Sequence, residues 1–132
     1  MSARPEQDML SWLHCQILAR QGAAEAVPHG PWHIEGRYPQ GISNAEAIVI
    51  AETFTGPEVP PNIAQHIVAH DPRDTIAHCE YELWELARHE ESPFRDCALC
   101  GSRDGDFPCQ SLLRLAHAYR HLPGWRPEWA PE

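Results

Sequence analysis

The sequence predicts an α+β protein that is mainly helical, with about four helices, a small β-hairpin and a zinc-binding loop. Three observations support this fold class. Apolar residues recur at helical spacing in several segments, and two short stretches have the alternating or β-branched pattern of strands. Three cysteines cluster between residues 97 and 109, in and beside a stretch rich in glycine, proline and aspartate.

The length of the chain is typical of one domain. With 132 residues it can bury a real core, so a bound metal would act as a brace and not as the whole source of stability. We therefore expect a single domain over residues 1–132. Its expected parts are an N-terminal helix and hairpin (1–60), a helical zinc-binding half (61–122) and an aromatic tail (123–132).

Helical segments are indicated by apolar spacing and by start signals. Leu10, Leu13 and Ile17 share one helical face. Asp71 followed by Pro72 is a strong helix-start pair, because aspartate caps the free N–H groups and proline suits the first helical position. The expected helices cover residues 6–21, 62–70, 72 to about 89, and Pro108 to about 122.

A hairpin is expected between the first two helices. Residues 32–38 alternate apolar and polar side chains, and residues 47–51 are short and β-branched. Residues 39–44 contain Pro39, Gly41, Ser43 and Asn44 and are predicted to connect the two strands. The tail tryptophans are expected to clamp the core.

The charge of the chain disfavours nucleic acid as a partner. The formal net charge is −9, from 19 acidic and 10 basic residues, and every basic residue is arginine. Such a surface repels phosphate backbones and instead favours solubility or a basic protein partner. The cysteine loop carries Arg95 and Arg103, but three aspartates offset them. A DNA-binding regulator is therefore the third-ranked interpretation.

The compartment is predicted to be the reducing cytoplasm. The first residues contain no apolar run of signal-peptide length, and no segment approaches the length of a membrane span. Cysteines in such a compartment are metal ligands more often than disulfide partners.

The cysteine cluster predicts a zinc site. Cys97 and Cys100 are separated by two residues, so both sulfurs can face one point, and Gly101 permits the tight backbone that follows. Cys109 comes directly after Pro108, at an expected helix start that favours the thiolate.

A fourth ligand is needed, and His89 is the best-placed candidate because it ends a helix just before the loop. An alternative uses Cys79 with the three clustered cysteines to hold an iron–sulfur cluster. The other candidates for the fourth position are Cys15, His117 and His121.

A second group of histidines supports a competing interpretation. His66 and His70 are spaced i, i+4 beside Asp71, as two ligands of one metal can be. They would serve a metal-dependent hydrolase or nuclease, with His78 as a further residue. The simpler interpretation is structural, with Asp71 capping a helix and His70 bonding helix carbonyls. A stripe of His78, Glu82, Glu85 and His89 is interpreted as a solvated face, with a second metal site as its alternative.

Several motifs are spread over nearly the whole chain. They are Gly30-Pro31-Trp32, His66-Ile67 with His70-Asp71-Pro72, His89 with Cys97-x-x-Cys100, Pro108-Cys109 with Leu112–Leu115, and Tyr119 with His121–Arg126 and Glu128-Trp129. Together they resemble an uncharacterised family of small zinc-knuckle proteins, a domain of unknown function from high-GC Gram-positive bacteria and their phages. The resemblance fits the ligand set His89, Cys97, Cys100 and Cys109, and it brings no activity.

The sequence contains no phosphate-binding glycine loop and no nucleophile elbow, so enzymatic activity is uncertain and not favoured. We expect a zinc-stabilised binding module that acts on a protein partner. The family context adds a regulatory or counter-defence role in a phage or its host as one interpretation.

Overall fold

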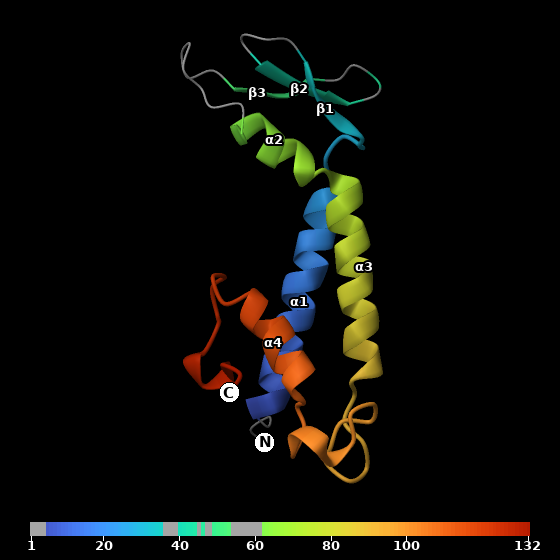
Figure 1. Cartoon of the computed structure of the whole chain (residues 1–132), viewed down its shortest axis with the longest axis vertical. Coiled ribbons are helices and arrows are strands. Elements are labelled where there is room, and N and C mark those ends of the chain that lie inside the picture. The colour runs from blue at the N-terminus through green and yellow to red at the C-terminus, as the bar shows by residue number, and fades with distance from the viewer. Residues whose placement is uncertain (1–4, 36–39, 45, 47–48, 54–61) are drawn as a thin grey trace. The chain divides into compact units, whose positions relative to one another are not determined.

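The structure is a computed structural model of the chain, and it describes residues 5–35, 40–44, 46, 49–53 and 62–132. The predicted α+β fold class is confirmed (Figure 1). Within the described residues the elements are α1 (Pro5–Glu25), β1 (Trp32–Glu35), β2 (Gln40–Asn44), β3 (Val49–Thr53), α2 (Asn62–Ala69), α3 (Pro72–Arg88), α4 (Gln110–Ala118) and the short 3₁₀ helices η1 (Ser102–Asp104) and η2 (Pro127–Trp129).

The start of α3 follows the predicted capping pair. The Oδ1 atom of Asp71 accepts hydrogen bonds from the backbone N–H groups of Arg73, at 2.9 Å, and Asp74, at 3.2 Å. These are two of the N–H groups that a helix start leaves without a helical partner. Pro72 occupies the first helical position, as predicted.

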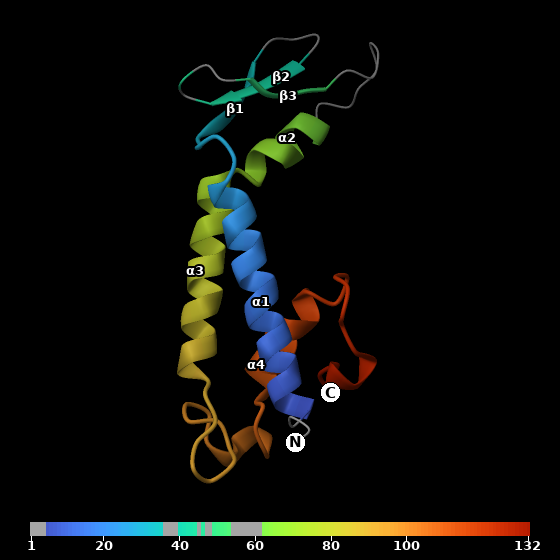
Figure 2. The same ribbon diagram turned by 180° about the vertical axis from the view of Figure 1, so that it is seen from behind.

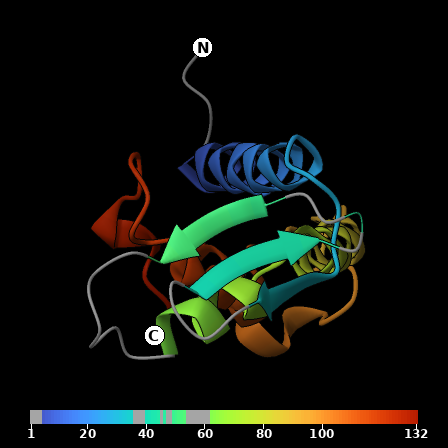
Figure 3. The same ribbon diagram turned by 90° about the horizontal axis from the view of Figure 1, so that it is seen from above.

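The β-structure is larger than the predicted hairpin. It is a three-stranded antiparallel sheet in the order β1-β2-β3, and Figure 3 shows the strands side by side. The prediction that residues 39–44 connect two strands is wrong, because residues 40–44 form β2. Pairing on both sides outweighs the low strand propensity of glycine and asparagine, and Ile42 is fully buried. The predicted strand residues 36–38 and 47–48 lie outside the described residues.

The chain divides into two compact units, which we describe separately. The first unit contains residues 1–19 and 80–132: most of α1, the end of α3, the cysteine loop, α4 and the tail. The second contains residues 20–79: the end of α1, the sheet, α2 and the start of α3. The expected single domain stays a prediction.

In the first unit, apolar residues from the helices and the loop are buried. Leu13 and Ile17 are fully buried on one face of α1, as their spacing predicts, while Leu10 of the predicted face is half-buried and Met9 is buried. Figures 1 and 2 show the first turns of α1 beside α4 in both views. A buried cluster contains Cys97, Phe107, Cys109 and Leu112, with Leu10, Leu86 and Cys100 packed against it.

The C-terminal tail packs against α1 through tryptophans. The ring centroid of Trp12 lies 5.9 Å from that of Trp125 and 5.5 Å from that of Trp129. The indole N–H of Trp12 also donates a hydrogen bond of 2.9 Å to the carbonyl of Pro123. The tail tryptophans therefore pack against α1, and Trp129 is buried.

In the second unit, α2 packs against β1 and β2. Ala64 is fully buried there, and the backbone N–H of Trp32 approaches Oδ2 of Asp71 at 3.5 Å. The carboxylate that caps α3 therefore also contacts the first strand. Among the helices of the described chain, none combines the length and the hydropathy that a membrane span needs.

Candidate metal centre

Four side chains from three parts of the first unit converge on one point. His89 directly follows α3, Cys97 and Cys100 lie in the loop, and Cys109 is the N-cap residue of α4. One nitrogen of His89 and the three sulfurs all lie within 4.8 Å of one another. His89, Cys97 and Cys109 are buried, and Cys100 is partly exposed. The structure thus brings together all four residues of the predicted ligand set, and they could hold a metal ion.

The distances within the group are compatible with a zinc site. The Nδ1 atom of His89 lies 3.4 Å from Sγ of Cys97, 3.5 Å from Sγ of Cys100 and 3.4 Å from Sγ of Cys109. In a tetrahedral site with ordinary zinc–nitrogen and zinc–sulfur bonds, a nitrogen and a sulfur ligand are about 3.5 Å apart. One ion at the centre would therefore reach all four atoms.

The loop around Cys97 and Cys100 is tightened by local backbone hydrogen bonds. The backbone N–H of Cys100 points to Sγ of Cys97, with 3.4 Å between nitrogen and sulfur. The N–H of Gly101 donates to the carbonyl of Cys97 at 2.8 Å, and Gly101 has a φ of 67°. That left-handed conformation favours glycine, which explains the residue after the second cysteine.

The three thiols differ in acidity. Burial raises the pKa of Cys97, but hydrogen bonds from the Cys100 backbone and from His89 outweigh it and lower the pKa to about 7. Burial raises the pKa of Cys109 to about 12, and the neighbouring Cys97 adds to that shift. Burial and Cys97 also raise the pKa of Cys100. Cys97 is therefore the first thiolate that the site offers to a cation.

A carboxylate orients the histidine. Oε2 of Glu85 lies 3.0 Å from Nε2 of His89, so the Nε2–H group donates to the carboxylate and Nδ1 is left to face the sulfurs. The sequence predicts Glu85 to lie in a solvated stripe, and that prediction does not include this role. The available signal was its spacing, since residues four apart on a helix are neighbours.

The other two residues of that stripe, Glu82 and His78, also make contacts. Glu82 accepts a hydrogen bond from the hydroxyl of Tyr119, which joins α3 to the end of α4. His78 is exposed and lies 3.8 Å from a carboxylate oxygen of Asp74. In the described part of the chain, the stripe forms no second metal-ligand group.

The other candidates for the fourth ligand lie outside the group. Cys79 is buried within α3, roughly two and a half helical turns before the helix ends. Cys15 is exposed on α1, and the ring of His117 contacts Trp125 at 5.8 Å. His121 is exposed as well. Of the described cysteines, only the clustered three accompany His89.

The second histidine group lies where α2 ends and α3 begins, with His66 in the last turn of α2, His70 directly after it and Asp71 directly before α3. The Nδ1–H group of His70 donates to the carbonyl of His66 at 2.8 Å, and the two rings lie 4.4 Å apart. The two oxygens of Asp71 accept bonds from Arg73 and Asp74 and approach Trp32. His66, His70 and Asp71 form no metal-ligand group among the described residues. These contacts agree with the structural interpretation.

Comparison with known proteins gives one match. No curated protein and no solved structure matches the chain. A family of unknown function, DUF6221, matches residues 6–131, which include all four residues of the metal group. The resemblance to an uncharacterised family is thereby confirmed at the level of the family. The chain belongs to the family of unknown function DUF6221.

Proposed function

We propose that the chain is a zinc-stabilised binding module that acts through a protein partner. The convergence of His89, Cys97, Cys100 and Cys109 carries the proposal. Zinc in structural sites takes four protein ligands in a tetrahedron, whereas a catalytic zinc keeps a position open for water or substrate. The group offers four protein atoms, enough for a complete tetrahedron, so a bound zinc would brace the fold and not act on a substrate.

Zinc is preferred over an iron–sulfur cluster because of the donor set and its spacing. An iron–sulfur cluster takes thiolates at separate irons, and Cys79 was the candidate for its fourth thiolate. The fourth donor beside the three sulfurs is instead the imidazole of His89, at 3.4–3.5 Å from each sulfur. Three thiolates and one imidazole around a single point are typical of structural zinc.

Exposed aromatic residues near the metal centre support contact with a protein. Phe94 in the cysteine loop is 86% exposed, and Trp84 on α3 is 53% exposed. The guanidinium of Arg88 lies 4.2 Å from the centre of the Trp84 ring, and Tyr81 contacts the same ring. Tryptophan, tyrosine and arginine are the residues that dominate protein interfaces.

The acidic charge supports a basic partner surface. The formal net charge of the chain is −9, and complementary charge speeds and orients protein association. A regulatory or counter-defence role in a phage or its bacterial host remains part of this proposal. That role rests on the family resemblance alone. We also propose a cytoplasmic location, which rests on the sequence alone.

The proposal is tested by measuring metal content and partner capture on the same preparations. The purified chain is expected to contain about one zinc per molecule. Immobilised protein should capture a defined partner from a lysate of its source organism, and Cys109→Ser should lose both the zinc and the partner. Cys15→Ser is the matched control, because Cys15 is exposed and lies outside the group.

Two results would contradict the proposal. Visible absorbance with stoichiometric iron and sulfide would replace the zinc site by a cluster. Turnover of a phosphodiester or peptide substrate that is lost in His70→Ala would favour the metal-dependent hydrolase, since His70 lies outside the zinc group.

A further inference from the structure

The four residues of the metal group differ in their access to solvent. Cys97 and Cys109 are each 1% exposed and His89 is 5% exposed, whereas Cys100 is partly exposed. A small solute in water therefore meets the metal centre first at Cys100. The difference matters because the susceptibility of a thiolate to oxidation follows its exposure.

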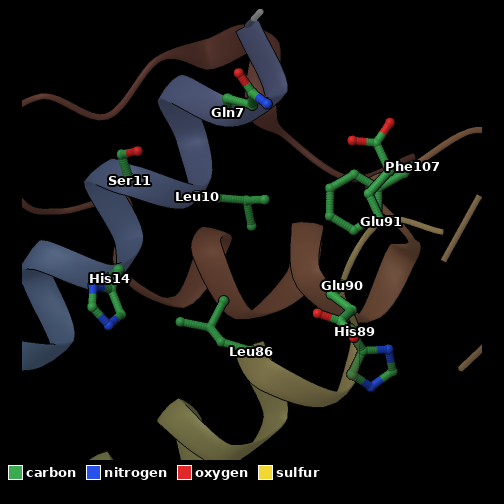
Figure 4. Close-up of a pocket in the computed structure, with 9 residues that line it drawn as sticks. All are labelled: Gln7, Leu10, Ser11, His14, Leu86, His89, Glu90, Glu91 and Phe107. Carbon is green, nitrogen blue, oxygen red and sulfur yellow. The ribbon is translucent and has the colours of Figure 1, made fainter. Parts of the chain in front are cut away.

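The cavities beside the metal centre provide no second route to a sulfur. His89 lines a cleft of about 420 Å³ together with Leu10, Leu86 and Phe107, and Figure 4 shows these side chains. His89 also lines a groove of about 310 Å³ between residues of α3 and α4. No cysteine of the described chain lines either space. Both spaces lead to the imidazole ring, so Cys100 remains the accessible sulfur ligand.

Hydrogen bonds also distinguish the three sulfurs. The backbone N–H groups of Leu99 and Cys100 face Sγ of Cys97, and that of Leu112 faces Sγ of Cys109. Among the described residues, no backbone N–H group bonds to Sγ of Cys100. Zinc would keep all three sulfurs as thiolates, and hydrogen bonds to a metal-bound sulfur withdraw electron density from it. Cys100 would therefore be the most nucleophilic of the three as well as the most accessible.

Cys97 is the sulfur best placed to react with an oxidised Cys100. The three sulfurs all lie within 4.8 Å of one another. Cys97 and Cys100 share one tight turn, in which the N–H of Gly101 donates to the carbonyl of Cys97 at 2.8 Å. Cys109 is instead the N-cap residue of α4. A disulfide between Cys97 and Cys100 therefore needs only local adjustment of the turn, whereas one to Cys109 would also pull on the start of a helix.

We infer that Cys100 is the oxidation-sensitive ligand of the metal centre, and that a hydroperoxide joins it to Cys97 in a disulfide and releases the zinc ion. The inference rests on the proposed function, because it requires zinc at the site. Only His89 and Cys109 would remain as ligands, which is half of a tetrahedral set. The loop between them, which carries the exposed Phe94, would lose its ties to the ion. Oxidation would thereby alter the surface that we propose for partner contact.

Two steps account for the atoms and electrons. The thiolate of Cys100 attacks one peroxide oxygen, which forms an S–O bond, breaks the O–O bond and expels hydroxide. The thiolate of Cys97 then attacks the oxidised sulfur, which forms the S–S bond, breaks the S–O bond and expels a second hydroxide. The two sulfurs lose two electrons and the peroxide gains two. Protons from the solvent convert both hydroxides to water.

Hydrogen peroxide is the probe, and the zinc-loaded full-length chain is the sample. A chromogenic chelator measures the released zinc, and N-ethylmaleimide then blocks the remaining thiols. Trypsin cuts after Arg95 and Arg103. One peptide therefore contains Cys97 and Cys100, and the next contains Cys109. The first peptide should become lighter by two hydrogens and carry no maleimide, and zinc should be released as fast as this product forms.

Two histidine variants form a matched pair. Cys100→His and Cys109→His each leave two cysteines and two histidines, a ligand set that also holds structural zinc. Cys109→His keeps the reactive pair and should release zinc about as fast as the parent chain. Cys100→His removes the accessible sulfur, so its zinc should be released roughly tenfold more slowly. Zinc content before the reaction verifies that each variant is loaded.

The outcomes separate this inference from the proposed function. A first disulfide that contains Cys109, or equal rates of zinc release from the two variants, would overturn the inference while the zinc module stands. So would full retention of zinc at a peroxide concentration that oxidises the exposed Cys15. A purified chain without zinc would overturn the proposed function instead. If a histidine variant does not load zinc, the peptide map of the parent chain decides the case alone.

Discussion

Oε2 of Glu85, in the last turn of α3, lies 3.0 Å from Nε2 of His89, which directly follows the helix. This contact selects the tautomer of the imidazole and directs Nδ1 toward the three sulfurs. The same carboxylate also accepts a bond from Arg88 at 3.3 Å, which fixes its position. Glu85 is therefore a positioning residue for the metal centre.

Glu85→Gln should weaken zinc binding by about 10- to 100-fold, because outer partners of metal-bound histidines have effects of that size. The measurement is competition with a zinc chelator at fixed pH. Glu80→Gln is the matched control, since Glu80 is exposed on the same helix and lies outside the metal group. Equal zinc affinity of the two variants would show that Glu85 does not position His89.

His89→Ala should lower zinc affinity strongly, while Cys79→Ala should leave it nearly intact. The reason is that Nδ1 of His89 faces all three sulfurs, whereas Cys79 lies within α3 and outside the group. Zinc stoichiometry after dialysis against a weak chelator measures the difference. The reverse order of effects would place the fourth ligand inside the helix.

Asp71→Ala should lower the unfolding midpoint by a few degrees at pH 7, because loss of an aspartate cap costs about 0.5–2 kcal/mol. Burial raises the pKa of Asp71, but the bonds from the Arg73 side chain and from the Asp74 and Trp32 backbones outweigh it and hold the pKa below its usual value. The folded carboxyl group thus holds its proton less tightly than the unfolded one. Its stabilising contribution is complete above the unfolded pKa and is lost as the pH falls through the folded pKa.

The difference in midpoint between Asp71→Ala and the parent chain should therefore shrink below about pH 4. Asp71→Asn serves as the comparison, because asparagine also caps helices but carries no charge. A midpoint difference that stays the same at every acidic pH at which the protein still folds would contradict a role for the charged carboxylate. Loss of a catalytic activity with an unchanged melting curve would favour the hydrolase interpretation.

Gly124→Ala should destabilise the tail and the start of α1. Gly124 has a φ of 95°, and a Cβ atom there would lie 2.6 Å from Nε1 of Trp12. The added methyl group would displace the indole and break its bond to the Pro123 carbonyl. We expect a loss of about 1–3 kcal/mol, measured by denaturant unfolding with tryptophan fluorescence.

Gly22→Ala is the matched control for that substitution. Gly22 lies in α1, and apart from its chain neighbours and the nearby backbone of the helix itself, no atom of the described residues lies within 4 Å of an added Cβ. Alanine is the better helix former, so this variant should be neutral or more stable by up to about 1 kcal/mol. Equal effects of the two substitutions would exclude the contact with Trp12 as the cause.

Binding to duplex DNA should be weak. The chain carries a formal net charge of −9, so heparin should retain it poorly at physiological salt. A binding titration in about 150 mM salt is the measurement. Sub-micromolar, sequence-dependent binding under those conditions would contradict a protein partner and favour the DNA-binding interpretation.

Features that depend on neighbouring residues could be predicted from the sequence. Asp71 before Pro72 starts α3 because the capping bonds reach only two and three residues ahead. The helical spacing of Leu13 and Ile17 identified the buried face of α1. The spacing of Cys97, Cys100 and Gly101 predicted a tight loop, and its hydrogen bonds also close within a few residues.

Features that depend on residues far apart in the sequence could be seen only in the folded chain. β2 forms at Gly41 and Asn44 because strands pair with it on both sides, which local propensity does not report. Among the candidates for a fourth ligand in the described chain, His89 is the one that lies with the three cysteines, because the fold brings its Nδ1 atom within 3.5 Å of their sulfurs. Leu10 in α1 packs against the buried cluster that contains Phe107, although the two residues are far apart in the sequence. Such contacts depend on how helices and loops pack, and packing is not encoded in any short stretch of sequence.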